Sequence, residues 1–397
     1  MIKKTLSKFN KMLHHQHHLN IHLHEQLRKF REGIYTLYLV HSTKSFVSSL
    51  IGFFIPIYLL TIDFSLVQVL WFFVLRYLSA IIFVPIAGLI GNRLGLKHTM
   101  MISLPLFLAY LIGIMSLEKF PNTIFLYTLS IFVSFVSALY WIPLHSLFAR
   151  FSSKKKSGNQ VSMLISLRSL SAMLAPLIGG LVSIYFGFEV LFGLAILILI
   201  IPTVLLFQAK DIHPHINFSV NDLWKIAKKH SRHFVTIALD AFGSFAEEIL
   251  WPLFVYLILL DTFSVGVVGS LIGVGTIIFT ILVGRIVGKK NYFTVIQIAA
   301  FVLSIVWIIR FFANEQITIY TASLLAGIFA MMFSVPLLSH TYQIAKQDEN
   351  LDEVIVFKEM VGVTSKLIAA LVTLLLVYKL NITFLIAGIS YLMVTIL

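Results

Sequence analysis

Twelve long apolar segments constrain this chain more than any other feature. A helix that crosses the hydrocarbon core of a bilayer needs roughly 20 apolar residues. Segments of that kind fall near residues 36–62, 67–91, 99–117, 122–148, 161–187, 188–208, 233–260, 264–288, 293–312, 316–344, 354–378 and 381–397. In lipid the backbone polar groups must pair internally, so each segment is expected to be a helix. The sequence therefore predicts an all-α polytopic membrane protein with twelve transmembrane helices.

The composition excludes several other classes of protein. Of the 397 residues, 59% are hydrophobic and 12% are charged, and the mean hydropathy is +0.95. A soluble domain has about a quarter of its residues charged, so a water-soluble globule is excluded. The absence of cysteine excludes disulfides and thiolate chemistry. The net charge of +13 comes from short basic runs between apolar segments, not from one continuous stripe, so nucleic acid is not an expected partner.

The positions of lysine and arginine predict the orientation of the chain. Loops on the cytoplasmic side of membrane proteins are enriched in these residues. With the N-terminus inside, nearly all basic loops lie inside, and only Lys119 and Lys379 fall on the opposite side. We therefore expect a multi-pass protein of the cell membrane with both termini in the cytoplasm.

The two halves of the chain repeat each other in register. Gly95 and Gly288 each close a basic loop between the second and third segment of their half, and Pro143 and Pro336 lie in the two fourth segments. The spacing is 193 residues for both pairs, from 95 to 288 and from 143 to 336. The repeat predicts two pseudo-symmetric six-helix bundles that run in the same sense. The expected units are a cytoplasmic His-rich basic arm at 1–35, a first half at 36–208, a cytoplasmic linker at 209–232 and a second half at 233–397.

The loop GLIGNRLGLKH, which begins at Gly88, resembles the signature loop between the second and third helices of the major facilitator superfamily. That loop usually reads glycine, three residues, Asp-Arg, one residue, Gly-Arg and a second basic residue. Arg93, Gly95 and Lys97 also match, whereas Asn92 replaces the aspartate. The resemblance implies the fold of this family and a gating role for the loop, in which Asn92 would act through hydrogen bonds.

The stretch APLIGG in the fifth segment is similar to the Gly-Pro-x-x-Gly-Gly motif of exporters in the same superfamily, with alanine in place of the first glycine. Pro176 interrupts the hydrogen-bond ladder of a helix. Gly179 and Gly180 allow another helix to approach closely, and Gly269 and Gly273 in the eighth segment predict the same kind of packing.

Nine ionisable side chains lie at mid-segment positions, where they are costly and are therefore candidates for function. They are Lys44, Arg76, Arg168, Asp240, Glu247, Glu248, Lys358, Glu359 and Lys366. Arg76 lies about ten residues into its segment, roughly 15 Å deep at 1.5 Å per residue, which is near the midplane. We expect Arg76, with Lys44 and Arg168, to bind an anionic or polar part of a solute. The alternative for each basic residue is a structural ion pair, or a side chain that reaches the interface.

Three acidic residues of the seventh segment indicate proton coupling. Asp240 and Glu247 lie two helical turns apart on one face. Glu247 and Glu248 diverge by about 100°, so one of them can face a cavity and the other a neighbouring helix. Burial favours the neutral form of a carboxyl group, which can then take up and release a proton. The alternative is a set of static ion pairs with Lys44, Arg76, Lys358 or Lys366.

Lys358 and Glu359 lie close to the cytoplasmic end of the eleventh segment. In the family this helix meets the signature loop, so the resemblance implies a gating role for both residues. His145 and His340 end the fourth segments, where interfacial packing is expected. Six histidines of the N-terminal arm are expected to lie against anionic headgroups, with a divalent metal as the alternative: His14, His15, His17, His18, His22 and His24.

The resemblance implies a secondary transporter that moves a small solute by alternating access. The sequence has no Gly-rich phosphate loop with a lysine and no arrangement of nucleophile and base, so neither ATP drive nor enzyme activity is expected, and no cofactor or metal. Coupling to protons is expected. The motif around Pro176 favours export and Arg76 favours an anionic solute, so the direction of transport is left open. Uptake of a small anionic metabolite, lipid translocation, and a non-transporting sensor or scaffold on the same fold are the alternatives. The expected partners are a small solute, protons and membrane lipid, and the protein is expected to be a monomer.

Overall fold

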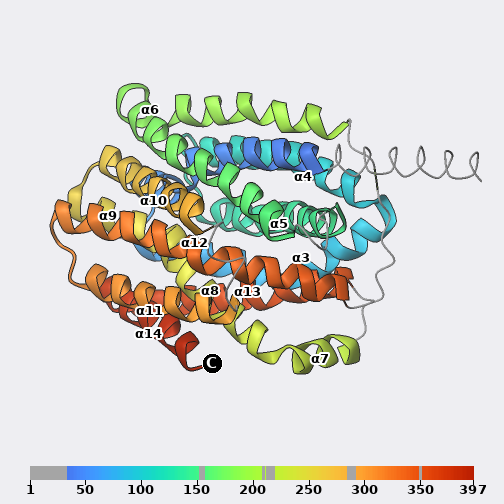
Figure 1. Cartoon of the computed structure of the whole chain (residues 1–397). Helices are drawn as coiled ribbons and strands as arrows, with labels where there is room; N and C mark the ends of the chain where they lie inside the picture. Colours follow the sequence, from blue (N-terminus) through green and yellow to red (C-terminus); the bar gives the residue numbers. More distant parts are fainter. Residues whose placement is uncertain (1–33, 152–156, 208–210, 212–219, 284–291, 348–350) are drawn as a thin grey trace, which may run out of the picture.

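Figure 1 shows the protein as a computed structural model in which long helices lie side by side in one bundle. The structure describes residues 34–151, 157–207, 211, 220–283, 292–347 and 351–397. In chain order its helices are a first helix over 34–52, α2 (Ile55–Thr61), α3 (Leu66–Leu94), α4 (Leu96–Ser116), α5 (Thr123–Phe151), α6 (Ser157–Phe207), α7 (Val220–Lys229), α8 (Ser231–Phe245), the π-helical turn η1 (Ala246–Leu250), α9 (Trp251–Leu259), α10 (Thr262–Val283), α11 (Tyr292–Phe311), α12 (Gln316–Gln347), α13 (Leu351–Leu375), the short η2 (Val377–Lys379) and α14 (Leu380–Ile396).

Ten helical stretches of the described residues are long and apolar enough to cross a bilayer, and two further features bring the number of spans to twelve. α6 contains two spans, because Gly187 adopts φ 80° and breaks the helix where 161–187 was divided from 188–208. α13 is long enough at 25 residues, but it carries five charged side chains. The prediction of an all-α polytopic membrane protein with twelve transmembrane helices in two pseudo-symmetric bundles is confirmed.

Local chemistry explains where several helices begin. Ser65 and Gln68 form a capping box at the start of α3, in which each side chain pairs with the backbone N–H of the other. The Asp261 carboxylate accepts hydrogen bonds from the backbone of Phe263 and Ser264, which starts α10. Gly95 separates α3 from α4 with a φ of 88°, a conformation that only glycine adopts without strain.

The helices up to α6 form one group and those from α8 on form the other, and the two groups share two main helix–helix interfaces. In Figure 1 the helices up to α6, blue to green, lie mainly in the upper part, and those from α8 on, yellow to red, lie mainly in the lower part. α13 packs against α3, and α10 packs against α6. α7 lies below the right-hand half of the bundle in Figure 1. The long ion-bearing helices α3, α6 and α13 therefore all take part in the contact between the groups.

Glycines allow α6 and α10 to approach closely. A Cβ atom on Gly266 would lie 2.6 Å from the carbonyl oxygen of Pro176, and a Cβ atom on Gly180 would lie 3.4 Å from the Cα atom of Gly266. On the other side of α6, a Cβ atom on Gly179 would lie 2.5 Å from the carbonyl oxygen of Leu50. Close backbone contact of this kind stabilises helix pairs in lipid, where burial of apolar side chains adds little.

Replacing Gly273 with alanine is expected to destabilise this contact. A Cβ atom there would lie 2.4 Å from the backbone nitrogen of Met173, so the helices must separate, at a cost of about 1–3 kcal/mol. Gly193→Ala is the matched control, because nothing lies within 4 Å of its added Cβ atom. Thermal unfolding in detergent should give a lower melting temperature for Gly273→Ala alone, and equal melting temperatures would contradict the packing.

Candidate functional site

Five charged side chains from both groups of helices lie near one another. We refer to Lys44, Arg76, Arg168, Glu248 and Lys366 as the central cluster; they come from the first helix, α3, α6, η1 and α13. Lys366 donates a hydrogen bond of 2.7 Å to Glu248. Arg76 and Arg168 lie within electrostatic range of Glu248 and of Lys44. The structure thus brings together the three basic residues predicted to bind solute and one of the predicted coupling acids.

Aromatic rings hold the ammonium group of Lys44. Its Nζ atom lies 4.5 Å from the ring centroid of Phe107 and 4.9 Å from that of Tyr140. It also donates a hydrogen bond of 2.8 Å to the Ser48 hydroxyl. The negative faces of aromatic rings stabilise a cation without neutralising it. Lys44 is therefore held in place by two rings and a hydroxyl group.

Neither Arg76 nor Arg168 forms an ion pair with any residue that the structure describes. The guanidinium carbon of Arg76 lies 5.9 Å from the ring centroid of Tyr77, and the Arg168 side chain is exposed. Guanidinium groups stay protonated in proteins. Even when the nearby Asp240 is counted with Glu248, the cluster holds four basic side chains against two acidic ones, so it favours an anion.

The two adjacent glutamates of η1 face different partners. Glu248 faces the central cluster, and its side chain keeps 45% of its surface exposed. Glu247 pairs with Arg310 of α11 through both carboxylate oxygens. Arg310 was not among the predicted site residues, because it lies two residues from the end of a predicted segment, where an arginine usually reaches the interface. The neighbouring Trp307 was the available signal, since a tryptophan face can bind a buried cation.

Asp240 lies apart from the ion pairs. The hydroxyl of Tyr391 donates a hydrogen bond of 3.1 Å to its carboxylate. Lys366, Glu248 and Lys358 lie within electrostatic range. Of the basic residues considered as static partners for the three acids, Lys366 is the one that forms an ion pair with them here. Asp240 therefore interacts electrostatically with the central cluster but forms no ion pair with its described members.

A second set of contacts joins the two groups of helices near the C-terminal end of α5 and in the N-terminal part of α13. Lys358 forms an ion pair with Glu359. The Nε2 atom of His145 on α5 lies 3.3 Å from Lys358 Nζ and 3.4 Å from Glu359 Oε1. His145 is buried and shares a hydrogen bond of 2.6 Å with Tyr342 of α12. In the same region Arg150 pairs with Asp352. These contacts must separate if the helices open at this end.

The signature loop is held by a residue from the predicted linker. The backbone N–H of Lys97 donates a hydrogen bond of 2.9 Å to the Asp211 carboxylate, which also contacts His98. A negative charge at the N-terminus of a helix such as α4 is stabilising. Gly88 and Gly95 are buried, and Arg93 is exposed. Asp211 thus supplies a carboxylate to the loop in which Asn92 replaces the aspartate of the family pattern.

Two predicted features lie outside the described residues. They are the histidines of the N-terminal arm and the basic loop that contains Gly288.

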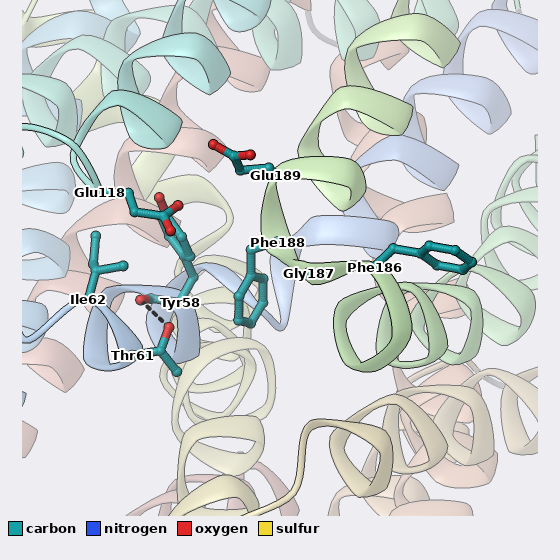
Figure 2. A pocket seen from close by; sticks show the side chains of 8 residues that line it. All are labelled: Tyr58, Thr61, Ile62, Glu118, Phe186, Gly187, Phe188 and Glu189. Atoms are coloured by element: carbon teal, nitrogen blue, oxygen red, sulfur yellow. Dashed lines mark hydrogen bonds between the residues drawn. The ribbon is translucent and has the colours of Figure 1, made fainter.

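A cavity of about 420 Å³ lies at the other end of α4 from the signature loop (Figure 2). Its lining comes from α2, the end of α4 and the break in α6: Tyr58, Thr61, Ile62, Glu118, Phe186, Gly187, Phe188 and Glu189. Figure 2 shows Phe186 pointing away from the other side chains. None of the ionisable residues predicted to act in transport lines this cavity, so it is distinct from the central cluster.

A protein-family model and solved structures match this chain. The family model described as Major Facilitator Superfamily matches residues 37–350. No curated protein matches the chain. Among solved structures, the human organic anion transporter MFSD10 (TETRAN) is similar with a TM-score of 0.70 and 12% sequence identity, over 92% of this chain and 99% of that chain. At that identity the likeness shows the fold.

Proposed function

The chain belongs to the major facilitator superfamily and is a multi-pass membrane transporter, and we propose that it carries an organic anion together with a proton by alternating access. The observation that carries this proposal is the central cluster, in which Lys366, Arg76 and Arg168 lie around Glu248. Lys44 lies near the two arginines, and Asp240 lies near Glu248. A solute bound there would lie between the two groups of helices, which is where transporters of this architecture bind their substrates.

The unpaired guanidinium groups support an anionic solute. A charge inside a membrane is costly unless it is paired or meets water. An anion that pairs with Arg76 and Arg168 would remove part of that cost, and it could accept two parallel hydrogen bonds from a guanidinium. The structurally similar human protein is an organic anion transporter, which supports the same class of solute.

The position of Glu248 supports coupling to a proton. As a carboxylate it accepts a hydrogen bond from Lys366. Its negative charge also offsets part of the positive charge of Arg76 and Arg168. Protonation of Glu248 would release Lys366 and make the cluster more positive, so a bound proton strengthens the binding of an anion. Linkage requires that a bound anion strengthen the binding of the proton by the same factor. Mutual strengthening favours transport of both in one direction, which under an inward proton gradient is uptake and not export.

The distribution of basic residues supports one orientation in the membrane. We place both termini in the cytoplasm, because that arrangement puts nearly all lysine and arginine loops inside. The contacts of His145 with Lys358 and Glu359 then close the cytoplasmic end, and the packing of α6 against α10 closes part of the other side. A full cycle would open these contacts in turn around the central cluster.

Binding can be tested with purified protein and a panel of matched solutes. Organic anions, such as aromatic carboxylates and sulfonates, should raise the melting temperature, and their neutral amides should not at equal ionic strength. A ligand at 100 times its Kd adds about 2.7 kcal/mol to the free energy of unfolding. Stabilisation by cationic analogues, with no effect of any anion, would contradict the proposed solute class.

A further inference from the structure

Arg310 is buried in an aromatic box at the level of η1. Its side chain has 0% of its surface exposed, and its guanidinium carbon lies 4.4 Å from the ring centroid of Trp251 and 4.5 Å from that of Trp307. Both terminal nitrogens donate to the Glu247 carboxylate. A planar guanidinium can stack on rings and bind a carboxylate through two nitrogens at once, which an ammonium group cannot do.

The aromatic box is itself fixed by its neighbours. The indole nitrogen of Trp251 donates a hydrogen bond of 2.9 Å to the hydroxyl of Ser323. The ring of Phe384 packs against both Trp251 and Trp307, with centroid distances of 5.6 Å and 5.5 Å. The two rings that Arg310 contacts, from α9 and α11, are therefore themselves held by residues of α12 and α14.

The glutamates lie on a turn whose geometry is unusual. η1 is a π-helical turn of five residues between α8 and α9. Such a turn inserts an extra residue and rotates the side chains that follow, and π turns are frequent at functional sites. Pro252 follows four residues after Glu248, and its ring displaces the carbonyl group that an α-helix would place there. The direction in which Glu248 points is thus set by the turn.

We propose that Arg310 is a positioning residue for Glu248: by gripping Glu247 it fixes the π turn in the register that aims the next side chain at Lys366. Glu247 then acts as the anchor of the turn, and Glu248 is the group that exchanges the proton. The part of this inference that concerns protons rests on the proposed function, whereas the part that concerns geometry does not.

The absence of cysteine allows a direct test of that geometry. Glu248→Cys is labelled with a small anionic thiol reagent, once with Arg310 intact and once with Arg310→Lys. Arg310→Lys keeps the charge but removes the planar grip, and it is expected to slow labelling at position 248 at least tenfold. Glu118→Cys, an exposed position at the far end of α4, is labelled in the same two backgrounds and should react at equal rates. Equal rates at position 248 as well would overturn the proposal.

A second variant and a second readout keep the test decisive. If Arg310→Lys does not give folded protein, Glu247→Asp shortens the anchor by one methylene, and the same loss of labelling is expected. In liposomes, Arg310→Lys should shift the pH profile of anion uptake toward that of Glu248→Gln. A wild-type pH profile together with unchanged labelling would overturn the positioning role. Failure of Glu248→Gln to alter uptake would instead contradict the proposed function and leave the labelling result to decide the geometry.

Discussion

Replacing Glu248 with glutamine is expected to abolish the accumulation of an organic anion that is driven by a pH gradient. Glutamine keeps the size and one oxygen that can accept from Lys366, but it cannot take up or release a proton. Exchange of labelled for unlabelled anion across the membrane requires no net proton movement and should persist. Purified protein in liposomes separates the two activities, because accumulation is measured with a pH gradient and exchange without one.

Glu118→Gln is the matched control for this variant. Glu118 is exposed at the end of α4, in the cavity of Figure 2 and away from the central cluster. It should accumulate the anion as the unmodified protein does. Accumulation by Glu248→Gln with an unchanged pH dependence would contradict the assignment of Glu248 as the coupling group.

Replacing Arg76 or Arg168 with glutamine is expected to weaken anion binding roughly ten- to a hundredfold. A hydrogen bond to a charged group contributes about 1.5–3 kcal/mol, and about 1.4 kcal/mol corresponds to a factor of ten in Kd. The two residues lie on α3 and α6, so the double variant should lose more affinity than either single variant. Equilibrium binding of a labelled anion to purified protein measures the Kd of each.

Arg232→Gln is the control for both arginine variants. Arg232 lies at the start of α8 and stacks on Phe293 at 3.7 Å, outside the central cluster. It removes the same charge and should leave the Kd unchanged. An equal loss of affinity in all three variants would show that net charge, and not the cluster, determines binding.

The fold could be predicted closely, because the hydrocarbon thickness of a bilayer fixes the length of each span. The division at Gly187 needed only a glycine between two apolar stretches, and the structure breaks α6 there. The segment 209–232 was expected only as a linker. It contains α7, a short helix in which Trp224 is exposed and Ile226 is buried. α7 is short and polar, so a search for long apolar segments does not detect it.

The residues of the candidate site could be predicted from the sequence, but the residues that each of them contacts could not. Charges inside apolar segments identified every member of the central cluster, since they are rare and costly there. The partner of Glu247 could not be predicted, because the π turn at η1 alters the helical register on which the expected face depends. Likewise, no spacing in the sequence indicates that Asp211 contacts the signature loop across 114 residues of chain.

Accumulation of an aromatic sulfonate in liposomes tests the central claim most directly. A sulfonate stays ionised, so it does not cross lipid as a neutral acid. With the outside one pH unit more acidic, co-transport of one proton with one monovalent anion predicts an internal concentration that rises toward roughly tenfold the external one. This accumulation should collapse when a protonophore removes the gradient. Uptake that only equilibrates the sulfonate, or that is indifferent to the pH gradient, would contradict the account.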